Sequence, residues 1–179
     1  EAPGRFLCRA CFNDLAACRI VDPVCSLCGL PLDGANRLEA EPLCIRCRVM
    51  RPRFDRARSL FQYAGPAGSL IRSFKYERDY FLGPELLRGV IQLGWFHAGP
   101  EPFDAVVPVP LHPRQQRRRG YNQAALLARV IAAQREAPLR NLLRRVRDTE
   151  TQTGLSTVMR AKNVHGAFRL TGKMRDQAR

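Results

Sequence analysis

The stretch that decides the fold is residues 105–135, AVVPVPLHPRQQRRRGYNQAALLARVIAAQR. Its first six residues are apolar apart from two prolines, which predicts a short buried strand that the prolines end. Its last fourteen residues, Asn122–Arg135, place apolar side chains at helical spacing behind an N-cap residue, Asn122, and predict a helix. The basic segment Pro113–Tyr121 between them is expected to be a loop.

The neighbouring segments complete an α/β pattern. Leu139–Val146 is expected to be a second strand or a short connector, so that strand, basic loop, helix and strand form a βαβ unit in an α/β sheet. The other expected elements are a strand over Ala57–Tyr63, helices over Gly68–Tyr76, Pro84–Phe96 and Thr157–Asn163, a polar loop over Thr149–Ser156, and a strand from Gly166.

The basic loop suggests a phosphate ligand. Open α/β sheets bind their ligands beyond the carboxyl ends of the strands, where this loop begins. The planar guanidinium of arginine pairs well with phosphate oxygens, and the loop carries four arginines, which are Arg114, Arg117, Arg118 and Arg119. A solvated basic loop with no ligand explains the same residues equally well, so physical reasoning alone leaves both interpretations open.

The charge of the chain is concentrated in its second half. The 179 residues carry a net charge of +14, made up of +3 over residues 1–103 and +11 over residues 104–179. Arginine supplies 27 of the 30 basic residues. This favours a phosphate partner, either a nucleic acid or a small phosphorylated ligand, although an arginine-rich genome would produce the same bias.

Length and hydropathy exclude several classes of protein. A 45% hydrophobic chain can bury a packed core, so disorder throughout is excluded. No apolar run approaches the roughly 18 residues that a membrane span needs. The N-terminal residues lack a basic and then apolar signal segment, and we expect a cytoplasmic protein.

The cysteines predict a zinc ribbon. All seven precede residue 48, and six of them form three C-x-x-C pairs. Cys25 and Cys28, then 15 residues, then Cys44 and Cys47 match the spacing of a tetrahedral zinc site. Four thiolates leave no open coordination position, so the metal would be structural rather than catalytic. The alternative, a disulfide framework, fits an odd number of cysteines poorly.

The remaining cysteines have no assigned partner. Cys8 and Cys11 form a knuckle whose other half either lies upstream of Glu1 or is one of the two pairs already described. Cys18 is expected to be a small buried apolar residue rather than a metal ligand.

Several motifs together resemble the ComF family, phosphoribosyltransferase-like proteins linked to bacterial competence and DNA uptake. The resemblance covers nearly the whole chain and includes an N-terminal double zinc ribbon. The motifs, in order, are CSLCGLP (25–31), PVPLHP (108–113), RRRGYNQA (117–124), RRVRDTETQTGLS (144–156) and RAKNVHGAF (160–168).

The resemblance implies two domains, a zinc ribbon over residues 1–50 and a type I phosphoribosyltransferase-like domain over 54–179. Such a domain is a parallel sheet with flanking helices, and it uses 5-phosphoribosyl-1-diphosphate with Mg²⁺. Diphosphate binding would fall on the turn after the first parallel strand, made of Val109, Pro110, Leu111 and His112, with Arg114 and Arg119. A flexible loop carrying Arg147, Thr149, Gln152, Arg160 and Asn163 would stabilise charge on the departing diphosphate, with Arg147, Gln152 and Arg160 in catalytic roles.

The chain departs from the family pattern after Phe168. The family continues with a buried strand, an acidic pair for the ribose and a Thr-Thr-Gly turn for the 5′-phosphate. Here Gly172 and Lys173 stand where that strand begins, and residues 174–179 contain neither feature. The resemblance therefore implies a truncated domain that lacks its donor-binding strand and loop, and we expect it not to bind the phosphoribosyl donor with useful affinity.

Three functions remain open at this stage. The chain is a transferase-like domain, or a zinc-ribbon protein that binds nucleic acid in DNA uptake without catalysis, or a non-functional fragment. Single-stranded DNA and the competence machinery are the expected macromolecular partners. Aromatic residues near Arg72 and Arg78 could stack on unpaired bases, although helix packing explains some of them equally well. These aromatic residues are Phe74, Tyr76, Tyr80 and Phe81.

Overall fold

A computed structural model describes residues 7–33, 41–92, 94, 102–152 and 154–171 of the chain. These residues belong to two compact units, Glu1–Ile71 with Leu93–Ala98, and Arg72–Gln92 with Gly99–Arg179. The expectation for residues 172–179, and the last part of the helix expected over Pro84–Phe96, lie outside the described residues. No helix within the described ranges is long and apolar enough to cross a membrane.

The first unit contains two short helices, α1 (Arg9–Ala17) and α2 (Ile45–Val49), and the beginning of α3 (Gly65–Tyr76). The strand expected over Ala57–Tyr63 is wrong, because only Phe61 pairs, in an isolated antiparallel bridge with Arg19. Beyond this bridge the two segments have other partners, because the Pro23 carbonyl oxygen accepts from the Leu32 N–H and the Ala57 N–H donates to the Leu27 carbonyl oxygen.

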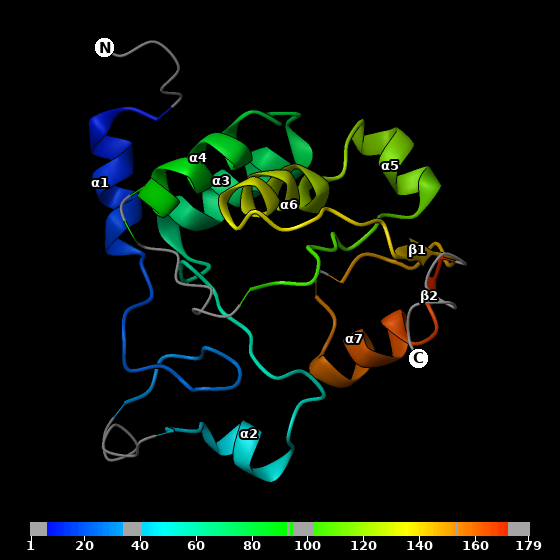
Figure 1. Cartoon of the computed structure of the whole chain (residues 1–179), viewed down its shortest axis with the longest axis horizontal. Helices are drawn as coiled ribbons and strands as arrows, with labels where there is room; N and C mark the ends of the chain where they lie inside the picture. The colour runs from blue at the N-terminus through cyan, green and yellow to red at the C-terminus, as the bar shows by residue number, and fades with distance from the viewer. Residues whose placement is uncertain (1–6, 34–40, 93, 95–101, 153, 172–179) are drawn as a thin grey trace. The chain divides into compact units, whose positions relative to one another are not determined.

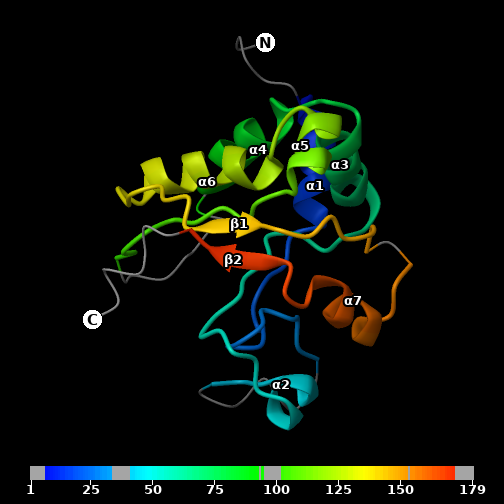
Figure 2. The same cartoon turned by 90° about the vertical axis from the view of Figure 1, so that its right-hand side faces the viewer.

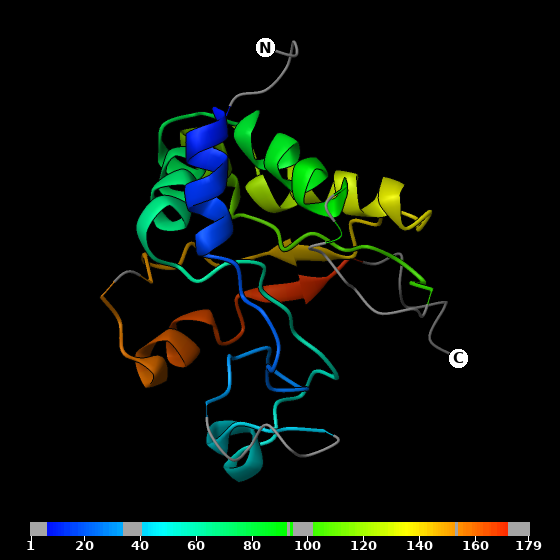
Figure 3. The same ribbon diagram turned by 90° about the vertical axis from the view of Figure 1, so that its left-hand side faces the viewer.

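The second unit is built on helices. Figures 1 and 3 show α4 (Leu82–Gln92) and α6 (Gln123–Gln134) lying side by side. The buried side chains of α4 are large, Leu87 and Val90, whereas those of α6 are small, Ala128 and Ala132. Small residues on one helix let a neighbouring helix approach closely. The N-cap expected for α6 is confirmed, because the Asn122 side chain accepts a hydrogen bond of 3.0 Å from the Ala124 N–H.

The basic segment that we expected to be a loop is a helix, α5 (Pro113–Arg119). His112 is its N-cap, and the Nδ1 atom accepts a hydrogen bond of 3.4 Å from the Arg114 N–H. Pro113 at the first helical position, then glutamines and arginines with high helix propensity, and Gly120 at φ 87° as the C-cap explain this outcome. The capping residues His112 and Gly120, with Pro113, decide the conformation of this segment, whereas its charge does not.

The strands of the second unit form a small antiparallel sheet. Figure 2 shows β1 (Leu143–Arg145) beside β2 (Phe168–Leu170), with Arg145 opposite Phe168. The helix α7 (Thr157–Val164) lies in the segment that connects these strands.

The parallel pairing expected for a βαβ unit is much reduced. Among the described residues it is a single bridge between Val106 and Leu139, with a hydrogen bond of 2.9 Å from the Val106 N–H to the Pro138 carbonyl oxygen. Pro108 and Pro110 have no N–H groups, so a ladder cannot extend regularly beyond Val106. The described residues therefore form a mixed structure of helices and a small antiparallel sheet.

The approach of α3 to α4 leaves no room for a side chain at Gly83. A Cβ atom there would lie 2.3 Å from Cζ of Phe74, a ring that is buried at 6% exposure and packed on Tyr121. We predict that Gly83→Ala lowers the free energy of unfolding by about 1–3 kcal/mol through overpacking, although alanine alone would favour the helix by about 1 kcal/mol.

Thermal unfolding followed by circular dichroism measures this effect. The matched control is Gly83→Ala in a Phe74→Leu background, in which the smaller side chain removes the clash and the loss should vanish. An equal loss in both backgrounds would contradict this account.

Candidate functional site

Two knuckles of the first unit bring four cysteines together. In the first knuckle the Gly29 N–H donates to the Cys25 carbonyl oxygen at 2.9 Å, and Gly29 adopts φ +71°, a conformation that favours glycine. In the second, Cys44 is the N-cap of α2 and Cys47 lies inside that helix. A hydrogen bond of 2.8 Å from the Ser26 N–H to the Pro42 carbonyl oxygen joins the two knuckles.

The geometry of the cluster fits zinc. The Sγ atoms of Cys25, Cys28, Cys44 and Cys47 all lie within 4.8 Å of one another, and those of Cys28 and Cys44 are 3.7 Å apart. Four sulfurs at about 2.3 Å from a tetrahedral zinc ion would be about 3.8 Å apart. Soft thiolates in this arrangement select zinc over magnesium or calcium. Four of the cysteines expected to bind metal are therefore placed together as a site for one ion.

Burial and backbone hydrogen bonds divide the thiols in their acidity. Burial raises the pKa of Cys25, but hydrogen bonds from the backbone N–H groups of Cys28, Cys44 and Leu27 together lower it by more, so its pKa is about 6. Burial also raises the pKa of Cys47 to about 12, together with hydrogen bonds to neighbouring thiols. Cys25 is thus the group that meets a metal as a thiolate at neutral pH, and the bound ion would displace the proton of Cys47.

The segment after the ribbon covers the first knuckle. The Ala57 N–H donates to the Leu27 carbonyl oxygen at 2.6 Å, and the Arg58 Nη1 donates to the Ser26 carbonyl oxygen at 3.1 Å. A Cβ atom on Gly29 would meet the Ala57 carbonyl oxygen at 2.8 Å. Glycine is therefore required at this position by both its backbone conformation and its close neighbour.

The other cysteines are not part of this cluster. Cys8 is the N-cap of α1, and its Sγ accepts a hydrogen bond of 3.4 Å from the Cys11 N–H; both side chains are exposed. Cys18 ends α1 half-buried, and its Sγ lies 3.7 Å from the Ala64 carbonyl oxygen. Within the described residues, Cys25, Cys28, Cys44 and Cys47 are the cysteines that converge as metal ligands.

The expected diphosphate turn lies in the second unit, at the start of α5. Val109 is 56% exposed, and its carbonyl oxygen accepts a hydrogen bond of 3.0 Å from Nδ2 of Asn122. Pro110, Leu111 and His112 are half-buried. Arg114 is exposed in the first turn of α5, whereas Arg119 ends that helix, with its guanidinium 5.3 Å from the ring centre of Tyr76. The expected residues are thus divided between the two ends of α5.

The residues expected on a flexible loop all lie in the connection between β1 and β2. Arg147 Nη1 donates to the His165 carbonyl oxygen, and Asn163 Nδ2 donates to the Glu150 carbonyl oxygen at 2.9 Å. Thr149 is buried, and its hydroxyl oxygen accepts a hydrogen bond from Arg145. Gln152 and Arg160 are exposed. The connection is therefore tied across itself by its own polar side chains.

Asp148 joins this connection to the turn, and the sequence reasoning missed it. Its Oδ1 lies 3.6 Å from His112 Nδ1 and accepts a hydrogen bond of 3.4 Å from Gln115 Nε2. Its Oδ2 lies 3.8 Å from Arg114 Nη1. The one signal for it in the sequence is its position directly after Arg144, Arg145 and Arg147, with a second acid, Glu150, two residues further on.

The cysteine cluster predicts that cysteines inside and outside it differ in their effect on zinc binding. We expect Cys25→Ser to lose the zinc that the purified protein carries, because three thiolates hold zinc far more weakly than four. The matched control is Cys18→Ser, which removes a half-buried cysteine outside the cluster and should keep the zinc. Metal analysis of both proteins after dialysis measures the result, and full retention of zinc by Cys25→Ser would contradict the assignment.

Comparison with known proteins gives a consistent group of relatives. No protein-family model and no solved structure matches the chain. Competence protein F of Haemophilus influenzae is 32% identical over 169 residues, which cover 92% of this chain and 69% of that protein. DNA utilization protein YhgH of Escherichia coli is 31% identical over 92% of this chain and 70% of that protein.

A more distant relative points the same way. Competence protein ComFC of Bacillus subtilis is 25% identical over 76% of this chain and 56% of that protein. The similarity to the two nearer proteins spans the cysteine cluster, the turn at His112 and the β1–β2 connection in one alignment of 169 residues. On this evidence, the chain belongs to the ComF family.

Proposed function

We propose that this protein acts in DNA uptake and that its second unit is a phosphoribosyltransferase-like domain that binds a diphosphate group. The names of the relatives, competence protein and DNA utilization protein, support the role in uptake. The phosphorylated ligand that the family resemblance suggests is 5-phosphoribosyl-1-diphosphate. We expect the turn Val109–His112 to hold a diphosphate group by itself, because the whole donor is not expected to bind this chain with useful affinity.

The observation that carries this proposal is the meeting of two separate segments at Asp148. The turn before α5 supplies His112 and Arg114, and the β1–β2 connection supplies the carboxylate between them. A ligand that contacts the turn therefore also meets the connection that carries Arg147 and Arg160. This is the arrangement needed for a loop to act on a group held by the turn.

The residues at this place suit a diphosphate and its metal. Arg114 can pair with phosphate oxygens through charge-assisted hydrogen bonds once it leaves Asp148. Mg²⁺ prefers carboxylate and phosphate oxygens and is usually held by one or two carboxylates, so Asp148 fits as its protein ligand. When bound, Mg²⁺ would neutralise the charge of the diphosphate. The exposed guanidinium groups of Arg147 and Arg160 would bind and orient the same group.

The diphosphate proposal is tested with inorganic pyrophosphate and Mg²⁺. We expect saturable binding at one site per chain in titration calorimetry, and about tenfold weaker binding by Arg114→Ala because a charge-assisted hydrogen bond is lost. The matched control is Arg129→Ala, an exposed arginine on α6. An equal loss in the control would show non-specific attraction by the basic surface, and no saturable binding would overturn the proposal.

A second candidate function, nucleic-acid binding by the ribbon, is supported by a row of exposed arginines. Arg46, Arg51, Arg53 and Arg56 are all exposed in or directly after α2. Arginines so placed neutralise phosphates of a nucleic-acid backbone without reading sequence. The chain would then bind DNA through its ribbon, whatever the second unit binds.

The ribbon candidate predicts a change in salt dependence. Each arginine that contacts a phosphate contributes about 1 to the slope of log K against log salt concentration. We expect Arg46→Ala with Arg51→Ala to lower this slope by about 1–2 for single-stranded DNA, measured by fluorescence anisotropy. Arg129→Ala again serves as the control, and a slope unchanged in the double variant would exclude the ribbon as the contact surface.

A further inference from the structure

Five aromatic rings and one arginine gather where α3, α4 and α6 meet in the second unit. Tyr121 packs on Phe74 at 5.9 Å between ring centres, and the hydroxyl of Tyr121 donates to the Phe74 carbonyl oxygen. Tyr80 stands edge-on to Tyr121 at 6.0 Å and to Phe81 at 5.9 Å. The rings are thus held in fixed orientations by contacts with one another.

Packing does not use all of this aromatic surface. Tyr76 is 63% exposed and Tyr80 is 59% exposed, whereas Phe74 below them is 6% exposed. The guanidinium of Arg119 lies over the Tyr76 ring at 5.3 Å, and its Nη1 donates to Gln123 Oε1 at 2.6 Å. Single exposed aromatic residues are common, but ring contacts here run from Phe81 through Tyr80 and Tyr121 to the buried Phe74, and such a connected group is typical of a binding surface.

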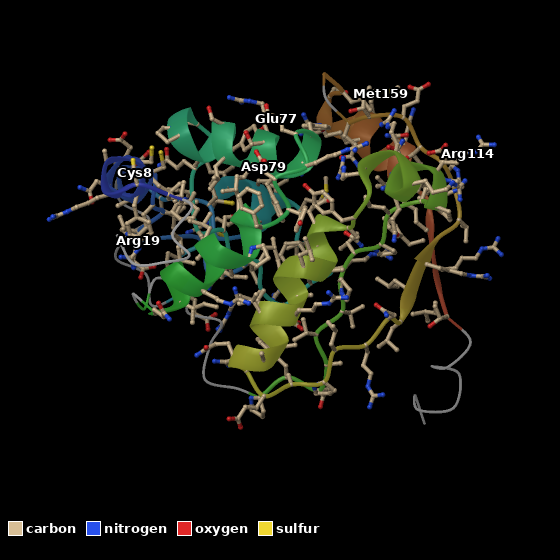
Figure 4. All side chains as sticks on the ribbon, turned by 90° about the horizontal axis from the view of Figure 1, so that it is seen from above. Cys8, Arg19, Glu77, Asp79, Arg114 and Met159 are labelled. Carbon is tan, nitrogen blue, oxygen red and sulfur yellow. The ribbon has the colours of Figure 1, made fainter. Side chains whose placement is uncertain are left out.

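Charge at this surface favours an anionic partner. Lys75, Arg78 and Arg119 lie next to the exposed rings in sequence or space. Two carboxylates, Glu77 and Asp79, lie in the same link between α3 and α4 (Figure 4). Glu77 accepts a hydrogen bond of 2.7 Å from the Ser73 hydroxyl, so one of these two carboxylates is bound by an uncharged neighbour. Three cations against two carboxylates, within a chain of net charge +14, leave the surface positive.

The turn between α5 and α6 extends this surface. Gly120 separates Arg119 from Tyr121, and it also lines an open hollow of about 470 Å³ with Pro113, Gln116 and Arg117. Arg117 is exposed there. A linear ligand that alternates flat groups with anionic groups could therefore contact Arg117 before Gly120 and the rings that include Tyr121 after it.

We propose that this aromatic surface, defined as Tyr76, Tyr80, Phe81, Arg119 and Tyr121, binds single-stranded DNA by stacking on its unpaired bases. The inference rests on the proposed role in DNA uptake, and it assigns the base contacts to the second unit. Every base offers a flat face to an aromatic ring, so such stacking tolerates any sequence, as a protein that handles DNA of varied origin requires. Bases within a duplex are already stacked and would not be available.

The test separates bases from phosphates. The zinc-loaded full chain is titrated with oligothymidylate of about 12 nucleotides and with an abasic oligonucleotide of the same length, which keeps the phosphates but has no bases. We expect the wild-type protein to bind oligothymidylate about tenfold more tightly than the abasic probe. Tyr76→Leu with Tyr80→Leu should lose most of this preference, because these are the most exposed rings of the surface and leucine keeps apolar surface but offers no ring.

Two controls make the outcome specific. Tyr63→Leu removes a tyrosine that is 64% exposed outside the aromatic surface, and it should keep the tenfold preference. A thermal unfolding curve of the double variant that matches the wild-type curve, followed by circular dichroism, shows that the variant is folded. A preference retained by the double variant, or lost equally in Tyr63→Leu, would overturn the inference.

The remaining outcomes separate this inference from the proposed function. Equal binding of both probes by the wild-type protein would overturn base stacking but leave DNA binding through phosphates intact. Failure of both probes to bind would overturn both. Displacement of oligothymidylate by thymidine monophosphate at equal base concentration would mean that the surface takes a free nucleotide, and the inference would again be wrong.

Discussion

The convergence of four sulfur atoms is the constraint on which the first unit depends. The buried cluster around the knuckles is Cys25, Leu32, Cys44 and Cys47, so Leu32 is its one large aliphatic side chain; the buried Leu15 of the same unit lies apart from it in α1. Burying one leucine contributes about 2 kcal/mol, while ordering each backbone residue costs about 1–2 kcal/mol. Zinc bound by such a site contributes about 10–16 kcal/mol, which is enough to offset the ordering of the knuckles. A metal bound by these cysteines would thus take the place of an apolar core around the knuckles.

The second unit is held together by apolar burial between helices and by local partners for its arginines, and both explain how a basic unit remains compact. Its helices α4 and α6 bury ordinary apolar residues. Its arginines are held apart by local partners: Arg114 faces Asp148, Arg119 lies over Tyr76, and Arg145 binds Thr149 and lies over Phe168. Arg114 remains exposed, where phosphate can reach it, whereas Arg119 and Arg145 are half-buried.

Sequence reasoning predicted the features that depend on local spacing. The four cysteines of the ribbon, the N-cap of α6 and the helix near residue 157 follow from intervals of a few residues, and the structure confirms them. It failed where a local choice depended on a capping residue, as at Gly120, or where a strand needed a partner, as at Phe61. It also missed Asp148, because the contact with His112 spans 36 positions and no periodicity announces it.

Phe74 takes part in two features that are usually separate. Its ring fills the space opposite Gly83, and the same residue supports Tyr121 through ring packing and its carbonyl oxygen. The packing of α3 against α4 and the arrangement of the exposed rings therefore depend on the same residue. A substitution at Phe74 changes both the packing of the interior and the arrangement of the exposed rings, so selection on either property constrains the evolution of the other.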